Sequence, residues 1–433
     1  MADIRRLALT LLCEQEAADK YVNLSLSSHK TDGLSDVLRG RLTALIYTVT
    51  ERRITYDYMI GALSGRSLDK IDPYTLNVLR LGACQILHMR SIPSFAAVNE
   101  TVKLCRNQGE RSFVNGVLRA LVKTADEPPM PPREKNLRRY LSVRYSIPLH
   151  TVRLLSDLLG IEECERLLEY WDGLSYTDLT VNTVKCSAED YLLKLNEDVT
   201  LTSPASLRIS HSVNPERLPG FAEGEFFVQD RASLASVVAL APKAGEILVD
   251  TCACPGGKSF AAAVLMQDSG RIYSFDLHES KLPLISSGAA RLGLRSVIVM
   301  QNDATAAYEP LIGSVDKVIC DVPCSGLGVL AKKPDLRYKS AEAIDALPPL
   351  QLQILTESAK YLRRGGEMIY STCTLNPAEN SQVVAEFLRE NPDFERVDFI
   401  TMGVESVDGE LTLIPHIHHT DGFFIAKLRR RSE

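Results

Sequence analysis

A strand, a glycine turn and a helix follow one another within Val249–Ala263, and this unit constrains the fold more than any other stretch. It reads VDTCACPGGKSFAAA: an apolar run ends at Asp250, and Gly256 and Gly257 precede a helix of small residues. In open α/β sheets such a unit cradles a cofactor at the carboxyl ends of the strands. The paired glycines let backbone N–H groups approach a ligand closely. The turn matches neither G-x-G-x-x-G nor G-x-x-x-x-G-K-[ST], which disfavours a dinucleotide or a nucleoside triphosphate.

From about residue 226, apolar strand candidates alternate with helical stretches. The expected strands are 247–250, 272–276, 296–300, 316–320 and 367–371, and the expected helices are 257–268, 279–292, 350–363 and 378–390. This alternation predicts a doubly wound, Rossmann-like α/β domain whose parallel sheet has right-handed crossovers. Residues 411–414 and 423–428 are expected to close the sheet with an antiparallel pair.

The first 124 residues favour an all-helical domain, because apolar residues recur there at three-and-four spacing. Four groups show this spacing: Ile4, Leu7, Ala8 and Leu11; Leu38, Leu42, Leu45 and Val49; Leu76, Leu79, Ala83 and Ile86; Val114, Val117, Leu118 and Leu121. The stretch DEPPMPPR at 126–133 holds four prolines and indicates a linker. Residues further on favour helices near 149–171 and 187–196 and a strand near 179–184. We therefore expect a helical domain at 1–125, a linker at 126–135, a small α+β connecting domain at 136–225 and the α/β domain at 226–433.

Bulk properties suit a globular cytoplasmic protein, for which we expect a monomer. Apolar residues make up 45% of the 433 and charged residues 24%. No apolar run approaches the ~20 residues of a membrane span, and the first residues lack the apolar core of a secretory signal. The ten cysteines show no framework spacing, as expected of reduced thiols. The net charge of −6 hides a split: residues 1–139 hold 21 Lys and Arg against 15 Asp and Glu, a net +6, and the remainder 28 against 40, a net −12. Such a basic front half is typical of a polyanion-binding module, or of a chance imbalance.

Acidic residues end three successive expected strands: Asp250, Asp276 and Asp303. In a doubly wound sheet these ends converge on the ligand crevice. A carboxylate after the second strand can bind a ribose diol, and one after the third an adenine amino group. A single Asp at a strand end more often caps the next turn. Three in register with a Gly-Gly turn favour an adenosine-bearing cofactor without phosphates.

Two cysteines follow the ends of the last two expected strands, Cys324 within DVPCSG and Cys373 within STCT. A polar crevice would make either thiol reactive, whereas the alternative is a buried structural cysteine. A zinc site is disfavoured, because its candidate ligands lack the paired C-x-x-C spacing of many zinc sites. These candidates are Cys252, Cys254, Cys320 and Cys324. A Ser–His–Asp triad is disfavoured by the missing G-x-S-x-G. His416, His418 and His419 are expected on a surface loop rather than at a metal, and we expect no metal site.

Five motifs together resemble those of the RNA cytosine-5 methyltransferases of the Sun/Fmu group. They are CACPGGK at 252–258, FDLHESKL at 275–282, QND at 301–303, DVPCSGLG at 321–328 and STCTLNPAEN at 371–380. The first 124 residues are similar to a NusB-like RNA-binding domain, through RLGACQILHMRSIPSFAAVNETVKL and SFVNGVLRALV. This domain order resembles that of bacterial small-subunit (16S) rRNA cytosine-5 methyltransferases of the RsmB type, over nearly the whole chain.

The resemblance implies S-adenosylmethionine as methyl donor and RNA, most simply 16S rRNA, as partner. The cofactor-binding residues that it implies are Cys252, Ala253, Cys254, Pro255, Gly256, Gly257, Lys258, Asp276, Asp303 and Asp321. It also implies Cys373 as the nucleophile that adds to carbon 6 of cytosine and Cys324 as the cysteine of product release. We expect Asp321 to bind the N3/N4 edge of the base and Lys258 to lower a thiol pKa or position the donor's carboxylate. Gln229 and Asp230 match a family segment near the cofactor pocket.

The chain departs from the family pattern at several positions. Cys254 replaces a usual alanine, Ala331 and Lys332 stand where arginines are usual, and Thr180 replaces the arginine of an R-x-N that ends at Asn182. Lysine does not reproduce the planar fork of arginine, so these changes bear on the target nucleotide more than on the reaction. The alternatives are the same chemistry on tRNA or another RNA and a non-catalytic RNA-binding or ribosome assembly factor. A dinucleotide oxidoreductase is disfavoured by the missing glycine fingerprint.

Overall fold

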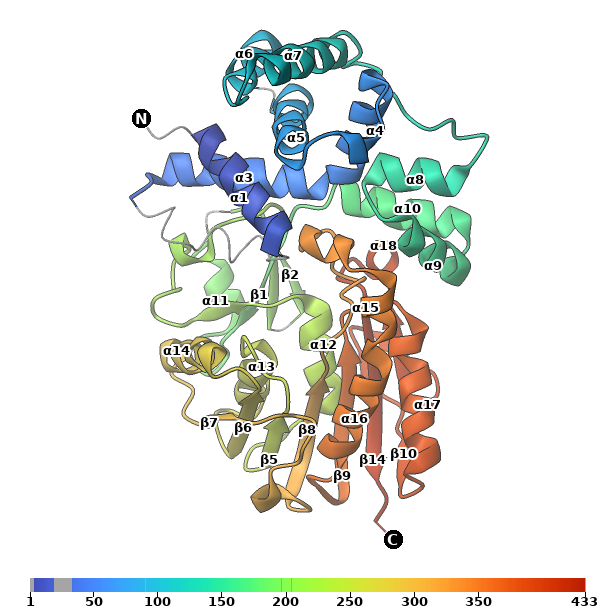
Figure 1. Ribbon diagram of the computed structural model, residues 1–433. Coiled ribbons are helices and arrows are strands. Elements are labelled where there is room, and N and C mark those ends of the chain that lie inside the picture. Colours follow the sequence, from blue (N-terminus) through green and yellow to red (C-terminus); the bar gives the residue numbers. More distant parts are fainter. Residues whose placement is uncertain (1–3, 19–32, 90, 196, 204, 433) are drawn as a thin grey trace. The chain divides into compact units, whose positions relative to one another are not determined.

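The computed structural model describes residues 4–18, 33–89, 91–195, 197–203 and 205–432 (Figure 1). The chain forms two compact units. The helical unit comprises Met1–Asp172 and Leu330–Tyr338, and the α/β unit comprises Gly173–Val329 and Lys339–Glu433. The chain therefore leaves the α/β unit after Val329, adds nine residues to the helical unit, and returns at Lys339. We call Leu330–Tyr338 the inserted segment.

The helical unit is built around α5 (Pro73–His88), in which every residue from Thr75 to Gln85 is buried. The helices that pack against α5 are α1 (Ile4–Ala18), α3 (Asp36–Glu51), α4 (Arg53–Ser64), α6 (Ser94–Val102) and α7 (Gln108–Lys123). Asp72 starts α5 by accepting a hydrogen bond from the N–H of Thr75, with Pro73 at the first helical position. All four apolar groups expected to be helical lie on these helices, and their inward residues form one core.

Three further helices belong to the helical unit: α8 (Leu137–Tyr145), α9 (Leu149–Leu159) and α10 (Ile161–Asp172). The single helix expected at 149–171 is two helices, because Gly160 adopts a φ of +83° between them. These helices pack on one another and on α4. The compact units thus divide the chain at residue 172, inside the stretch 136–225 expected to form one connecting domain.

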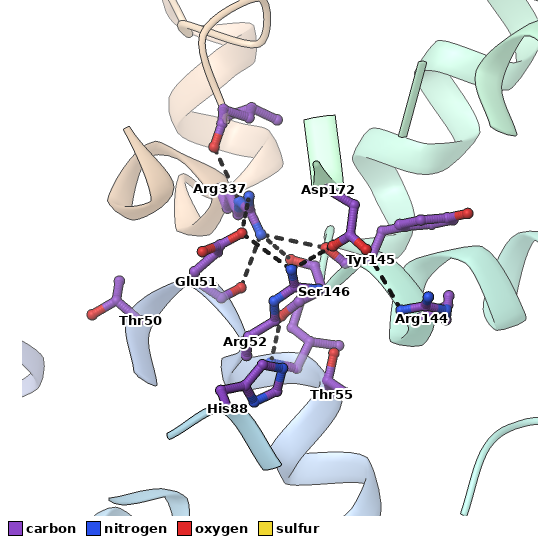
Figure 2. A network of polar contacts seen from close by, with 12 residues as sticks. Thr50, Glu51, Arg52, Thr55, His88, Arg144, Tyr145, Ser146, Asp172 and Arg337 are labelled. Atoms are coloured by element: carbon purple, nitrogen blue, oxygen red, sulfur yellow. Dashed lines mark hydrogen bonds and ion pairs between the residues drawn. The ribbon is translucent and has the colours of Figure 1, made fainter. Parts of the chain in front are cut away.

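Arg337 anchors the inserted segment, which ends in the 3-10 helix η6 (Pro334–Tyr338). Its side chain is buried, and its guanidinium donates to the carbonyl oxygens of Leu330 (3.2 Å), Glu51 (2.9 Å) and Tyr145 (3.3 Å). Figure 2 shows these bonds converging on Arg337 beside the ion pair of Arg52 with Asp172. The hydroxyl of Tyr338 donates to the carbonyl of Thr50 (2.6 Å). The inserted segment is therefore part of the polar interior of the helical unit.

A small antiparallel sheet opens the α/β unit, with strand order β2-β3-β1-β4. Its elements are β1 (Thr177–Val181), α11 (Ala188–Leu192), β2 (Val199–Ser203), β3 (Ser206–Ile209) and β4 (Phe226–Val228). The strand expected at 179–184 and the helix expected at 187–196 both occur, with shifted ends. Because β4 pairs with β1, this sheet extends past the boundary expected at residue 225.

The main sheet has the order β10-β14-β9-β8-β5-β6-β7, with β13 paired to β14. Its strands are β5 (Ile247–Asp250), β6 (Arg271–Asp276), β7 (Val297–Gln301), β8 (Val315–Asp321), β9 (Leu362–Thr372), β10 (Phe394–Arg396), β13 (Glu410–Leu413) and β14 (Phe423–Arg430). Strands β5 to β9 are parallel, and β14 runs antiparallel to β9. β11 (Ile400–Thr401) and β12 (Val404–Glu405) form a separate pair. The expected parallel sheet and its closing antiparallel pair are confirmed.

Helices cover both faces of the main sheet (Figure 1). The helices that pack on the sheet are α12 (Arg231–Leu240), α13 (Gly257–Leu265), α14 (Leu282–Leu292), α16 (Leu347–Ala359) and α17 (Ser381–Glu390). Two shorter helices, α15 (Ala341–Asp345) and α18 (Pro415–His418), and several 3-10 turns lie in the connections. Alternate strand residues enter different cores: Ile319 packs with α12, α13 and α14, whereas Val318 and Cys320 pack with α16 and α17. This two-sided burial is the reason that the strands read as continuous apolar runs. No helix in the described ranges has the length and apolar character needed to cross a membrane.

Candidate active site

The carboxyl ends of β5 and β8 form the topological switch point of the main sheet, because β5 pairs with β6 on one side and β8 on the other. Ligands of doubly wound sheets bind at such a point. Asp250 ends β5, Asp276 ends β6, Asp321 ends β8 and Thr372 ends β9. The polar residues expected at strand ends from sequence are therefore brought to one edge of the sheet.

The glycine turn at 252–258 lies between β5 and α13. The N–H of Ala253 donates to the carbonyl of Phe275 (2.7 Å), which ties the turn to β6. Gly256 adopts a φ of +110°, and a Cβ there would meet the Phe260 ring at 2.4 Å, so only glycine fits. Pro255 is exposed, whereas Cys252 and Cys254 are half-buried and pack against the two cores.

Asp250 is fully buried beneath this turn, where its Oδ2 accepts a hydrogen bond from the Ser259 hydroxyl (2.7 Å). Its Oδ1 is a buried oxygen without a hydrogen-bond partner among the described residues. Burial raises the pKa of Asp250 to about 7. An unsatisfied buried oxygen beside a glycine turn is a place where a polar ligand group would be stabilised.

Asp276 and Asp303 accept hydrogen bonds within their own loops. Asp276 is 9% exposed and accepts from the N–H of His278 (3.0 Å). Asp303 is exposed and accepts from the N–H (2.9 Å) and the hydroxyl (2.7 Å) of Thr305, which lower the pKa of its carboxyl. Each carboxylate thus stabilises the turn after its strand, which is the alternative weighed from sequence, and its orientation is set by that turn.

Lys258 and Asp321 form an ion pair with 2.7 Å between Nζ and Oδ2. The other carboxylate oxygen of Asp321 accepts from the hydroxyl of Ser371 (2.7 Å). Asp321 and Ser371 are register partners at the ends of the parallel strands β8 and β9. The ion pair therefore links the glycine turn, through Lys258, to the end of β8, which leads to Cys324.

Cys324 and Cys373 are brought together, with 3.2 Å between their sulfur atoms. Cys324 follows β8 by three residues and Cys373 follows β9 by one, so the parallel pairing of these strands delivers both thiols to one place. The Cys373 thiol and burial together raise the pKa of Cys324 well above its usual range. The backbone between them is tied as well, since the N–H of Gly328 donates to the carbonyl of Cys373 (2.9 Å).

Cys320 differs from Cys324 and Cys373 because it lies in the apolar core and not at the carboxyl end of the sheet. It is fully buried in the core between β8, β9 and α16, and burial raises its pKa to about 12. In the part of the chain that the structure describes, no group of three or more His, Cys, Asp or Glu side chains is placed to hold a metal ion.

The expectation that His416, His418 and His419 lie on a surface loop is wrong for the first two. His416 and His418 lie on the short helix α18, where the ring of His418 accepts a hydrogen bond from the N–H of Ile414 (2.8 Å).

The small sheet contributes residues that lie against the glycine turn. A Cβ on Gly257 would lie 3.5 Å from the side-chain nitrogen of Gln229, and Gln229 accepts from the hydroxyl of Thr180 (3.1 Å). Asp230 caps α12 and accepts from the hydroxyl of Thr420 (2.7 Å). Asn182 donates to the carbonyls of Gly224 and Leu292 (both 2.9 Å). Gln229 thus lies beside the turn, whereas Asn182 fastens the small sheet to the main domain.

Glu379 is a buried residue of the site that the sequence reasoning did not single out. It lies in the 3-10 helix η7 (Pro377–Glu379) and bonds Ser325, the neighbour of Cys324. A signal was present, since Glu379 is the only charged residue between Glu367 and Glu386. A lone charge in a long uncharged stretch with strand and helix signals indicates a buried, paired carboxylate.

Together the sheet order, the glycine turn at the switch point and the paired thiols define a Rossmann-like methyltransferase domain. A family model described as 16S rRNA methyltransferase RsmB/F matches residues 237–429, and a NusB family model matches residues 2–123. The chain is 34% identical over 446 residues to the probable ribosomal RNA small subunit methyltransferase B of Bacillus subtilis (strain 168), covering 99% of both chains. It therefore belongs to the RsmB/F methyltransferase family, with a NusB domain in front.

Solved structures agree with this fold. The crystal structure of PH0851 is 25% identical, with a TM-score of 0.80 over 99% of both chains. A methyltransferase homolog protein from Pyrococcus horikoshii is 28% identical, with a TM-score of 0.60, and covers 68% of this chain and 99% of its own. The similarity to the methyltransferase homolog protein thus covers a smaller share of this chain than the similarity to PH0851.

Proposed function

We propose that this protein methylates carbon 5 of cytosine in RNA, with S-adenosylmethionine as donor and small-subunit (16S) rRNA as substrate. The observation that carries the proposal is the thiol pair Cys324 and Cys373, 3.2 Å apart beside the Lys258–Asp321 ion pair. A single methyl transfer to a good nucleophile would require no thiol. Carbon 5 of cytosine is a poor nucleophile, and a thiolate that adds at carbon 6 turns the ring into an enamine-like nucleophile.

The residues of the switch point fit the proposed donor. S-adenosylmethionine would supply an electrophilic methyl group. In this proposal the backbone N–H groups of the glycine turn at 252–258 approach the donor, and the buried Oδ1 of Asp250, which has no hydrogen-bond partner among the described residues, lies at the start of that turn. In this proposal Asp276 binds the ribose diol and Asp303 the adenine amino group. Both are held by their own turns, and in each the bonds from the turn go to Oδ1.

In this proposal Cys373 and Cys324 have different roles toward the base: Cys373 adds to it, and Cys324 assists its release. The Cys373 thiolate bonds to carbon 6, and the protonated or hydrogen-bonded N3/N4 edge of the ring, held by Asp321, takes up the displaced electron density. After carbon 5 has gained the methyl group, a base removes the proton from carbon 5. The electron pair of that C–H bond restores the ring double bond, and the carbon–sulfur bond breaks to release Cys373. We assign assistance in this release to Cys324, which lies against Cys373.

The NusB domain would supply affinity for the RNA. Residues 1–139 carry a net +6 on a chain of net −6, so this part of the chain suits a polyanion. The target base has to leave its stack, which costs about a few kcal/mol unless it already lies in a loop. A separate RNA-binding domain offsets that cost and selects loops or bulges.

Two variants test the reaction. Cys324→Ala, incubated with cognate RNA and S-adenosylmethionine, is expected to accumulate a protein–RNA adduct that survives denaturing electrophoresis, because Cys373 adds but is released slowly. Cys373→Ser is expected to lose both methylation and the adduct. Absence of any adduct with Cys324→Ala, or full activity of Cys373→Ser, would overturn the proposed mechanism and leave the assembly-factor alternative.

The substrate needs a separate experiment. Bisulfite sequencing of cellular RNA, with and without the gene for this protein, is expected to show one or more 16S rRNA cytosines that lose methylation. Loss of a tRNA site with unchanged rRNA would move the same chemistry to tRNA.

A further inference from the structure

Glu379 is a fully buried carboxylate that receives hydrogen bonds from four donors. Its Oε2 accepts from the N–H of Ser325 (2.8 Å) and the amide of Gln351 (3.0 Å). Its Oε1 accepts from the hydroxyl of Ser325 (2.6 Å) and the amide of Asn376 (3.0 Å). A buried carboxylate is stable only with such partners, and here both oxygens are satisfied.

Three of the four donors come from the two segments that carry the thiols, and the fourth, Gln351, comes from α16. Ser325 directly follows Cys324, and Asn376 follows Cys373 by three residues. Gln351 on α16 also donates to the carbonyl of Pro323 (2.9 Å), the residue before Cys324. The hydroxyls of Ser325 and Thr374 lie 2.7 Å apart, so the neighbours of the two cysteines are bonded to each other as well. Glu379 is the group on which these bonds converge.

The chemistry of the side chain matters at this position. A glutamine would place an amide nitrogen opposite two donors, since each oxygen of Glu379 faces two. An aspartate would keep the charge but is one methylene shorter. Unsatisfied buried donors are costly, so either change is expected to let the two thiol segments move apart.

On the basis of the proposed function, we propose that Glu379 is a positioning residue that holds Cys324 against Cys373, so that product release can follow methyl transfer. Glu379 acts through Ser325, Asn376 and Gln351 and does not itself touch the substrate. The residues that the proposal assigns to the methyl donor lie mostly on other elements, at 250–258, 276 and 303. Asp321, at the end of β8, is held by Lys258 and Ser371 rather than by Glu379, so loss of Glu379 should affect release more than cofactor binding.

The distance between the sulfurs can be probed without RNA. Phenylarsine oxide bridges two nearby thiols, forming two arsenic–sulfur bonds with loss of one water. Peptide mapping by mass spectrometry is expected to find the bridge between Cys324 and Cys373 in the wild-type protein. Glu379→Gln and Glu379→Asp are expected to lose most of it. Glu367→Gln is the matched control, because Glu367 is a partly buried carboxylate in the middle of β9, six residues before Cys373, and is paired with Lys317.

The consequence for the reaction is read with both cysteines present. Glu379→Gln is expected to lower kcat by about tenfold or more, with KM for RNA and the Kd of S-adenosylhomocysteine within about twofold of wild type. It should also accumulate the protein–RNA adduct that Cys324→Ala traps. A purely structural loss would reduce methylation and adduct together, and calorimetry with S-adenosylhomocysteine reports the folded fraction.

Retention of the arsenic bridge and of kcat in both Glu379 variants would overturn the positioning role. So would a fall in kcat without adduct in the variant that still binds S-adenosylhomocysteine. If Cys324→Ala itself forms no adduct, the proposed function fails, while the arsenic bridge still decides whether Glu379 holds the two sulfurs together.

Discussion

Arg337 in the helical unit and Glu379 in the α/β unit are both buried charged side chains that hold an irregular segment in place. Arg337 donates to the carbonyls of Glu51 and Tyr145, the last residues of α3 and α8. Helix ends leave such carbonyls without partners, and a cation there also complements the helix dipole. Glu379 instead accepts three hydrogen bonds from the loops that flank the thiols and one from Gln351 on α16.

The difference lies in what each charge holds. Arg337 joins regular helices to the inserted segment, so its loss should be felt in the stability of the helical unit. Glu379 joins two loops whose residues carry the chemistry, so its loss should be felt first in turnover. Burial of a charge is therefore not by itself a sign of catalysis, and the identity of its partners decides its role.

The largest effect on stability is expected from Arg337→Met. It leaves the carbonyls at the ends of α3 and α8 without a buried donor, and the free energy of unfolding of the helical unit should fall by about 4 kcal/mol. Hydrogen exchange at the amides of α3 and α8 measures this loss. The control is Arg363→Met, whose half-exposed guanidinium pairs with Asp316 and is expected to cost less than about 1 kcal/mol. Equal losses in the two variants would contradict the anchoring role.

Asp250 is also a buried carboxyl, but it accepts a side-chain hydrogen bond only from Ser259 among the described residues, whereas Glu379 accepts four hydrogen bonds. Burial raises the pKa of Asp250 to about 7, above its ordinary value of 3.8. The native state therefore holds the proton more tightly than the unfolded chain. This stabilisation is complete below pH 3.8 and is lost as the pH rises through 7, by about 4 kcal/mol. Denaturant unfolding of the cofactor-free protein should show the fall, and Asp250→Asn should remove it. An unchanged slope in the variant would assign it to other groups.

Glu367 titrates in the opposite direction. Burial alone would raise its pKa, but Lys317 and Lys427, at 2.8 and 3.1 Å, lower it to about 2. The stabilisation is present above the ordinary value of 4.5 and is lost as the pH falls towards 2. Glu367→Gln should lower the free energy of unfolding at pH 7 by about 2 kcal/mol and flatten its dependence on acid. Turnover of the folded variant should remain that of wild type, and a selective loss of kcat would contradict the contrast with Glu379.

The smallest effect is expected from Tyr338→Phe in the inserted segment. The variant removes the hydroxyl that donates to the carbonyl of Thr50 but keeps the ring beneath the Arg53 guanidinium. One neutral hydrogen bond is worth about 1 kcal/mol. Denaturant unfolding of both variants should show a smaller loss in the free energy of unfolding for Tyr338→Phe than for Arg337→Met. A larger loss for Tyr338→Phe would show that Tyr338, and not Arg337, anchors the inserted segment.

The strand ends and the glycine turn could be predicted from sequence because they depend on local pattern. Strands β5, β8 and β9 read as apolar runs, since both faces of the sheet are covered. Their positions after two expected strands place Cys324 and Cys373 on the crevice side of the sheet, whereas their joint roles were implied by the family resemblance; the parallel pairing of β8 and β9 brings the two thiols together. The roles assigned to these residues stay predictions for the variants described above to test.

Other features escaped the sequence because they depend on distant partners. Nothing local in the inserted segment indicates that it joins the helical unit. The carbonyls to which Arg337 donates belong to Glu51 and Tyr145, which are far from it along the chain. Glu379 stands out in the sequence only as a lone charge between Glu367 and Glu386, and nothing local indicates that its partners are Ser325 and Gln351. The break at Gly160 was missed because the apolar period runs on both sides of it.

What the sequence by itself determined is the kind of domain and the chemistry within reach of its edge: alternating strands and helices, a glycine turn, and two thiols after successive strands. Only the tertiary structure decided which charges support that edge and which support the helices. The physical reason is that apolar periodicity and turn residues act over a few neighbours, whereas a buried charge takes its meaning from whichever groups folding brings against it.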